Sequence, residues 1–511
     1  MQGWTDGYVT EIAYTHGFHD ELLPWPMMAA LADAGRPVPV APGASFDYCE
    51  LGFGQGFSLA LMAAANPQAQ FWGNDFNPDH VAHVAGLAAR AGLANLQVSS
   101  RGFADYDDGS LPDFDIIALH GVWSWVGPTA RADIVRFIDR RLKPGGIVYL
   151  GYNALPGWAQ YLPLRRVMLE HARRGQGDLA GRIGAALDMA GRLEGQGAGY
   201  FRINPTVGPR RDLLAGKDAA YLAHEYFNES WEPVYFTDLA AALAPAGLRM
   251  AAQARPADRW EEAGQAPAIQ AVGGEAVADP DFAEMLRDFL TNRPFRRDLF
   301  QREGGNPYPL GADDGGDWLV AFAHPRDLPR RATLPTAGTI DPPWDLSYAV
   351  LTALQAGPAQ VVALAAALEK SPDEMAPVLR LLTALGLIGP ALPPSGLGDR
   401  QAACDRLNRA IMAEAHNADR LTALACPVTG GAVAVDRISL LFLDGLAAGA
   451  APVSFTWKVL QAAGQRVTRD GKPLLTEKQN LAELEERWLR FQQRRLPVLN
   501  LLGATQQNRQ G

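Results

Sequence analysis

Cysteine and long apolar runs are scarce in this sequence, and each shortage excludes a class of protein. The 511 residues include three cysteines, Cys49, Cys404 and Cys426, which lie far apart and are odd in number. Because a disulfide framework needs paired cysteines, a reducing compartment fits best. No stretch approaches the roughly 20 apolar residues that span a bilayer, and the first residues lack the basic start and apolar run of a signal peptide. We therefore expect a cytoplasmic protein with no membrane insertion.

Basic charge is also in short supply, which bears on the choice of partner. The chain has 46 Lys and Arg against 56 Asp and Glu, so its formal net charge is −10, and it contains no long Lys/Arg run. Proteins that live on nucleic acid usually carry a basic face that neutralises phosphates. The charge balance therefore predicts no nucleic-acid partner, although it does not exclude a local basic patch. At this length two or three domains are expected.

Strands and helices alternate over residues 44–255, after a helical stretch, 1–43, that ends in a Pro/Gly-rich linker. Apolar strands are expected at Phe46–Leu51, Ala69–Gly73, Leu96–Ser99, Phe114–His120 and Ile147–Tyr152. Alternation at this spacing is typical of parallel crossovers in a doubly wound α/β sheet. A helical insert at about 156–232 interrupts the pattern, and the strand Leu248–Gln253 ends the same sheet.

The rest of the chain is interpreted as a connector, 256–341, and a second domain, 342–505. Three short amphipathic helices near the start of this domain resemble a winged-helix core. In a DNA-binding domain of this kind the third helix presents basic and polar side chains to the groove, yet residues 375–385 offer only Arg380. We therefore expect a mostly helical, winged-helix-like domain that contacts either another protein or a second copy of this chain, as in a homodimer.

A glycine-rich loop joins the first strand to the first helix. It contains Glu50, Gly52, Gly54 and Gly56. Glycines let the backbone turn tightly and approach a ligand, and the helix N-terminus adds partial positive charge. The dinucleotide fingerprint G-x-G-x-x-G needs its third glycine where Phe57 stands. The acidic-x-Gly-x-Gly-x-Gly form instead resembles the first motif of class I methyltransferases, whose ligand has no phosphate; the alternative is an ordinary strand–helix turn.

Candidate ligand-binding residues follow the second and third strands. Asp75 lies 19 positions after Gly56, just past the second strand. A carboxylate there can accept both vicinal hydroxyls of a ribose, and a cap for the next helix is the alternative. Gly102 and Phe103 lie where an adenine ring is expected, although Phe103 fits the domain core equally well.

Polar and aromatic residues also follow the fourth and fifth strands. His120 and Trp123 stand at the end of the fourth strand, and Tyr152 at the end of the fifth. Because strand ends at the switch point of such a sheet face the ligand crevice, these three are the candidate catalytic residues of an acceptor pocket. His120 acts there as a base, an orienting donor or a pocket wall.

Two histidine pairs, His16/His19 and His80/His83, have the spacing of metal ligands. No Cys, Asp or Glu completes either set, so no metal is expected.

Several segments together resemble one bacterial family. They are residues 14–18, 74–78, 120–125, 152–158, 224–233 and 466–474. The family is the class I methyltransferases with a methyltransferase regulatory domain, which includes rickettsial protein-lysine methyltransferases, and the resemblance spans almost the whole chain. It implies S-adenosyl-L-methionine as the cofactor, with residues 1–43 as a helical lid. The candidate cofactor-binding residues are Glu50, Gly52, Gly54, Gly56, Asp75, Phe76, Gly102, Phe103, His120 and Tyr14.

The acceptor of the methyl group is less defined than the cofactor. The helical insert and the C-terminal domain favour a protein substrate, methylated on lysine, because a metabolite needs no such platform. One alternative is methylation of a small molecule or glycan in a pocket of aromatic residues, Trp123, Trp125, Tyr152 and Trp158. The other is a non-catalytic scaffold that binds the cofactor.

Overall fold

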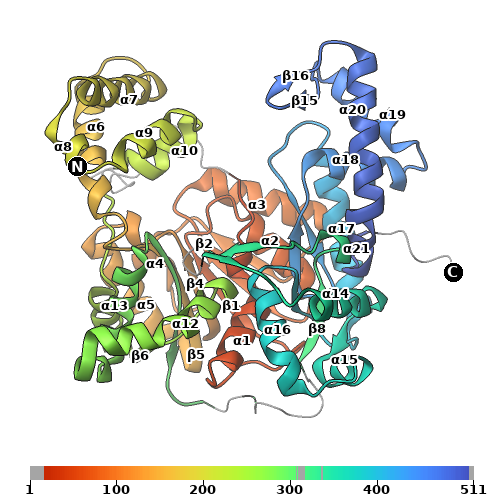
Figure 1. The fold of residues 1–511 in the computed structure, drawn as a ribbon, viewed down its shortest axis with the longest axis horizontal. Coiled ribbons are helices and arrows are strands. Elements are labelled where there is room, and N and C mark those ends of the chain that lie inside the picture. The colour runs from red at the N-terminus through yellow and green to blue at the C-terminus, as the bar shows by residue number, and fades with distance from the viewer. Residues whose placement is uncertain (1–15, 229, 306–307, 309–316, 335–337, 506–511) are drawn as a thin grey trace.

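A seven-stranded mixed sheet forms the centre of the molecule (Figure 1). The computed structural model describes residues 16–228, 230–305, 308, 317–334 and 338–505. The strands are β1 (Asp47–Leu51), β2 (Gln70–Asn74), β3 (Leu96–Ser99), β4 (Phe114–His120), β5 (Leu142–Asn153), β6 (Leu248–Gln253) and β7 (Phe295–Arg302). Their order is β3-β2-β1-β4-β5-β7-β6, and β7 pairs antiparallel with both of its neighbours. The predicted α/β sheet is confirmed.

Helices cover both faces of this sheet. One face packs against α1 (Pro24–Asp33), α2 (Phe57–Ala65) and α3 (Pro78–Ala91). The other packs against α4 (Phe103–Tyr106), α5 (Pro128–Arg141) and α11 (Phe236–Leu243). All nine residues of α2 are buried. A helix that is apolar all round needs partners on every side, and α2 lies between the sheet and the C-terminal part of the chain.

The helical insert is present, and it leaves the sheet at the carboxyl end of β5. It consists of α6 (Leu162–Arg174), α7 (Leu179–Gly195), α8 (Gly199–Ile203), α9 (Val207–Ala215) and α10 (Ala219–Tyr226). In Figure 1 it stands at the upper left, and the C-terminal helices α18 (Arg437–Ala447), α19 (Pro452–Ala462) and α20 (Glu477–Arg490) stand at the upper right. Both therefore project from the same side of the molecule.

The sequence analysis missed β7, which lies within the expected connector. Its sequence, FRRDLFQR, carries charged residues where a buried strand is expected to be apolar, yet Arg296 and Asp298 are both fully buried. Arg296 pairs with Asp298 and with Glu284 and Asp288 of α13 (Pro280–Thr291), and this compensation makes the burial tolerable. The first part of the expected connector, before α13, is helical in α12 (Pro256–Gly273).

The C-terminal part is mixed α/β: most of its described residues lie in helices, and several short strands accompany them. Helices α14 (Trp344–Ala353), α15 (Val361–Ala367) and α16 (Pro372–Ala384) accompany a three-stranded sheet of order β11-β8-β12. Those strands are β8 (Trp318–Ala321), β11 (Ala359–Gln360) and β12 (Ile388–Pro390). The winged-helix interpretation stays a prediction.

The C-terminal part packs directly on the domain of the seven-stranded sheet. Helix α17 (Leu397–Glu414) lies against α2 and α3. The buried side chain of Asn66, just after α2, donates to the carbonyl oxygens of Met62 and Gly430 and accepts from Trp25 Nε1. This one amide therefore joins α1, α2 and the turn before β14 (Gly431–Ala434).

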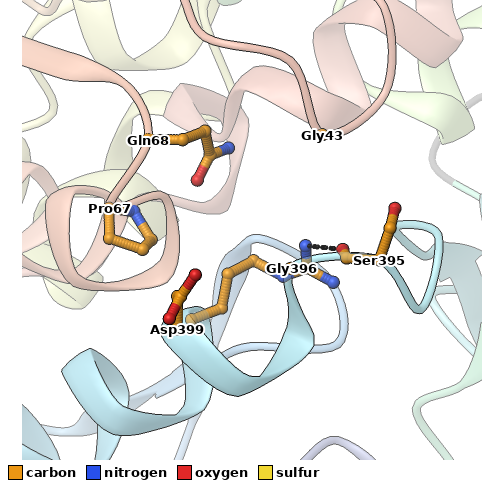
Figure 2. A pocket seen from close by; sticks show the side chains of 7 residues that line it. Gly43, Pro67, Gln68, Ser395, Gly396 and Asp399 are labelled. Carbon is orange, nitrogen blue, oxygen red and sulfur yellow. Dashed lines mark hydrogen bonds between the residues drawn. The ribbon is translucent and has the colours of Figure 1, made fainter.

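A pocket of about 430 Å³ lies at this junction (Figure 2). Pro67 and Gln68, which follow α2, face Ser395 and Asp399 at the start of α17. The pocket is at the end of α2 remote from the glycine loop, so it is separate from the predicted cofactor site.

Candidate functional site

The glycine loop has a geometry that other residues do not tolerate. Gly52, Gly54 and Gly56 have φ values of +72°, +58° and +69°, a region that favours glycine. A Cβ on Gly52 would lie 2.6 Å from a methyl carbon of Val122, and one on Gly56 would lie 2.7 Å from Val84 Cβ. The loop therefore forms a tight cradle at the carboxyl end of β1.

Asp75 ties this loop to the start of α3. Its Oδ2 accepts the backbone N–H of Gly54 at 2.8 Å, and its Oδ1 accepts the N–H of Asn77 at 2.9 Å and Nδ1–H of His80 at 3.0 Å. The side chain of Asn77, not of Asp75, caps α3. The carboxylate is thus oriented beside the loop, where a ribose-binding residue is expected.

Glu50 supplies a second buried carboxyl group to the loop. Its side chain is 4% exposed, and its Oε2 has no hydrogen-bond partner among the described residues. Burial raises the pKa of Glu50 to about 8, and the nearby charge of Asp75 contributes further. A buried acceptor without a donor is costly, so a ligand that donates a hydrogen bond, such as one with an amino group, fits this position.

The remaining cofactor candidates lie around the loop with different exposures. Gly102 is exposed at the start of α4, and Phe103 is half-buried and packs against the core on the α5 side. Phe76 is half-buried after β2. Tyr14 lies outside the described residues.

His120 is at the centre of a polar cluster at the end of β4. Its Nδ1 lies 2.9 Å from Tyr149 Oη, and its ring centroid lies 4.2 Å from that of His19. Glu21 completes the cluster. One carboxylate oxygen of Glu21 and one ring nitrogen each of His19 and His120 lie within 4.8 Å of one another. Burial and the neighbouring His19 lower the pKa of His120 to about 3, so its imidazole is neutral near pH 7.

The fold thus supplies the acidic residue that the sequence reasoning did not find for the histidine pairs. Glu21 and His120 come from widely separated segments, and no local pattern links them. Tyr149 was missed for a different reason, because it lies within a buried strand whose apolar pattern gives it no distinct signal.

Tyr152 and Trp123 do not join His120, and this placement does not fit the catalytic roles expected of them. Side chains alternate between the faces of a strand. Tyr149 packs in the core on the α2 side, whereas Tyr152 is fully buried on the α5 side and donates to Asp298 Oδ2 at 2.7 Å. Trp123 is buried in the same α5-side core, with the Arg131 guanidinium 5.6 Å from its ring.

Trp125 and Trp158 hold the helical insert rather than an acceptor. Both belong to the hydrophobic core of the insert. Trp125 Nε1 donates to the carbonyl oxygen of His224, and Trp158 Nε1 donates to Asn153 Oδ1 at the end of β5. The two indoles therefore fix the insert to the carboxyl edge of the sheet.

Comparison with known proteins identifies two parts of the chain. Residues 49–148 match the methyltransferase domain, and residues 218–302 match the predicted methyltransferase regulatory domain. The chain is 34% identical over 509 residues to the uncharacterized protein sll1526 of Synechocystis sp., with 98% of this chain and 100% of that protein covered. It is 30% identical over 254 residues to the uncharacterized protein RP789 of Rickettsia prowazekii, which covers 49% of this chain and 45% of that protein.

A solved structure has the same fold over nearly the whole length. PKMT2 from Rickettsia typhi in complex with AdoHcy matches with a TM-score of 0.67 at 18% identity, covering 96% of this chain and 100% of that chain. The strand order β3-β2-β1-β4-β5-β7-β6 is also typical of class I methyltransferases. The chain therefore belongs to the class I, S-adenosylmethionine-dependent methyltransferases that carry a methyltransferase regulatory domain.

Proposed function

We propose that this enzyme methylates lysine side chains of a protein substrate. The observation that carries the proposal is the fold shared with PKMT2 from Rickettsia typhi over 96% of the chain, including the insert and the C-terminal part. The resemblance of the sequence to rickettsial protein-lysine methyltransferases supports it. The location in the cytoplasm and a homodimer stay predictions.

The residues around the glycine loop fit the cofactor. The glycines turn the loop tightly with positive φ, Asp75 presents an oriented carboxylate beside it, and Glu50 has a buried oxygen without a donor among the described residues. When bound, S-adenosylmethionine supplies a methyl group already activated on a sulfonium, so the protein has mainly to align the nucleophile and exclude water. The loop and Asp75 would fix the position of the cofactor, and His120 at the end of β4 would face the acceptor.

The insert and the C-terminal helices support a large substrate. Trp125 and Trp158 anchor the insert at the edge of the sheet that carries the glycine loop and His120. The helices α18–α20 project on the same side of the molecule as the insert (Figure 1). A protein chain approaching His120 would therefore meet both projections.

Labelling of host lysate tests the proposal. Purified enzyme with S-adenosylmethionine carrying a radioactive methyl group is added to a lysate, with Asp75→Ala as the inactive control. The expected result is labelled protein that yields Nε-methyl-lysine on acid hydrolysis. Label found only in the low-mass fraction would support methylation of a small molecule instead, and cofactor binding without any transfer would support a scaffold.

A further inference from the structure

The segment from His16 to Leu22 crosses the carboxyl edge of the sheet beside the glycine loop. The backbone N–H of His19 donates to Ser58 Oγ at 3.0 Å, in the first turn of α2. Tyr48 Oη donates to the carbonyl oxygen of Leu22 at 3.1 Å. These contacts with β1 and α2 fix the side chains of this segment relative to the loop.

Glu21 and the two histidines present hydrogen-bond acceptors toward one another. One carboxylate oxygen of Glu21 and one ring nitrogen of each histidine lie within 4.8 Å of one another, and all three side chains are half-buried. Burial lowers the pKa of both His19 and His120, so both rings are neutral. If His120 donates Nδ1–H to Tyr149 Oη, its Nε2 carries a lone pair. With that tautomer of His120, and with an unprotonated ring nitrogen of His19 in the cluster, three hydrogen-bond acceptors meet at this point.

The charge of Glu21 is already balanced. Arg297 Nε donates to Glu21 Oε1, and both side chains are largely buried. The same three side-chain types also bind transition metals. However, a divalent cation would lie beside the positive charge of Arg297, so a neutral ligand is favoured over a dication.

We infer that Glu21, His19 and His120 form the subsite for the acceptor nitrogen and that this subsite takes a primary amine. A neutral amine has two N–H donors and one lone pair. Two of the converging acceptors can hold the N–H groups, which leaves the lone pair free for the methyl carbon. A hydroxyl has a single donor and would leave acceptors unpaired. The inference rests on the proposed function, because it assigns the end of the lysine side chain.

The histidines position the amine rather than deprotonate it. Lysine has a pKa of about 10.4, whereas the pKa of His120 is about 3, so transfer of the ammonium proton to this imidazole is unfavourable by roughly seven orders of magnitude. The ammonium loses its proton to water before the methyl transfer. The C–N bond then forms as the C–S bond breaks, with the electron pair left on sulfur, and the methylammonium product loses a proton to water.

Binding of n-butylamine tests this subsite without need of the protein substrate. Protein saturated with S-adenosylhomocysteine is titrated at pH 9.5 with n-butylamine and, separately, with 1-butanol, and binding is followed by NMR. We expect the amine to bind at least tenfold more tightly than the alcohol. Glu21→Gln and His120→Phe should each weaken amine binding at least tenfold, and Glu21→Gln should leave the affinity for S-adenosylhomocysteine within about twofold of wild type.

His416→Phe is the matched control, because His416 pairs with Asp444 in the C-terminal part and should leave both affinities unchanged. The inference would be overturned if amine and alcohol bound equally well, or if Glu21→Gln bound the amine as tightly as wild type. It would also be overturned if the purified protein contained one zinc or iron ion per chain that was lost in His19→Ala. The proposed function fails separately. If lysate yields no methyl-lysine but amine binding depends on Glu21, the subsite stands. If lysine is labelled equally by wild type and Glu21→Gln, the function stands and the subsite does not.

Discussion

His80 donates Nδ1–H to Asp75 Oδ1 at 3.0 Å, and each side chain of this pair is only 6% exposed. The other carboxylate oxygen of Asp75 accepts from the N–H of Gly54. The histidine therefore holds the carboxylate in the orientation in which it meets the glycine loop, as an outer partner does for many binding residues.

We expect His80→Ala to weaken binding of S-adenosylhomocysteine about tenfold and Asp75→Ala about a hundredfold or more. His80→Ala removes one hydrogen bond that orients the Asp75 carboxylate, whereas Asp75→Ala removes the carboxylate itself. Calorimetric titration measures both affinities. His416→Ala is the control, since it breaks a similar His–Asp contact of 2.6 Å in the C-terminal part that involves neither Asp75 nor Gly54. Equal affinity in His80→Ala and wild type would show that the loop alone orients Asp75.

A Cβ on Gly52 should be more harmful than one on a glycine of similar conformation in open space. Gly109 also has a positive φ, of +87°, but no atom lies within 4 Å of the position that its Cβ would take. We expect Gly109→Ala to cost about 1 kcal/mol of unfolding free energy from backbone strain. Gly52→Ala adds the clash with Val122, about 1–3 kcal/mol more, and abolishes cofactor binding. Urea unfolding and titration of each variant check this, and similar losses in both would refute the close approach to Val122.

The glycine loop and the position of Asp75 beside it were largely predictable from the sequence, whereas the cluster of Glu21, His19 and His120 was not. Glu50, the three glycines and Asp75 lie close together along the chain and follow strands with clear apolar patterns, so local sequence defines them. The cluster of Glu21, His19 and His120 exists only because the N-terminal segment crosses the sheet edge.

Two errors in the sequence analysis have definite physical causes. Strand β7 escaped notice because ion pairs between Arg296 and acids of α13 replace the usual apolar side chains. Tyr152 was assigned to the crevice because it ends a strand. However, side chains alternate between the two faces of β5, and Tyr152 lies on the face away from His120.

Glu50 should make the stability of the ligand-free protein fall as pH rises. Its pKa is about 8 in the folded protein, above the value of about 4.5 in the unfolded chain. The folded state therefore holds the proton more tightly. This contribution is complete below pH 4.5 and is lost as pH rises to 8, at up to about 1.4 kcal/mol per pH unit.

Glu50→Gln removes this titration, so we expect the variant to gain stability relative to wild type between pH 5.5 and pH 7.5. Urea unfolding without ligand at both pH values measures the difference, which should grow by about 2 kcal/mol. At pH above 8, where Glu50 is a carboxylate, the same variant should bind S-adenosylhomocysteine more weakly, because an amide is a poorer acceptor than a carboxylate. A difference in stability that is constant with pH would contradict the raised pKa of Glu50.

Two tyrosines of β5 provide a direct comparison of the two faces of the sheet. Tyr149 Oη contacts His120 Nδ1, and Tyr152 Oη donates to Asp298, which also accepts from Arg296. Each Tyr→Phe change removes one buried hydrogen bond and should cost about 1–2 kcal/mol of unfolding free energy. Only Tyr149→Phe frees the His120 ring, so we expect it to lower kcat/KM about tenfold, while Tyr152→Phe stays within about twofold of wild type. Methyl-transfer kinetics and thermal unfolding of the two variants decide the matter. If Tyr152→Phe loses as much kcat/KM as Tyr149→Phe at equal stability, then the α5 side of the sheet takes part in the reaction, and the assignment of the acceptor to the His120 side is wrong.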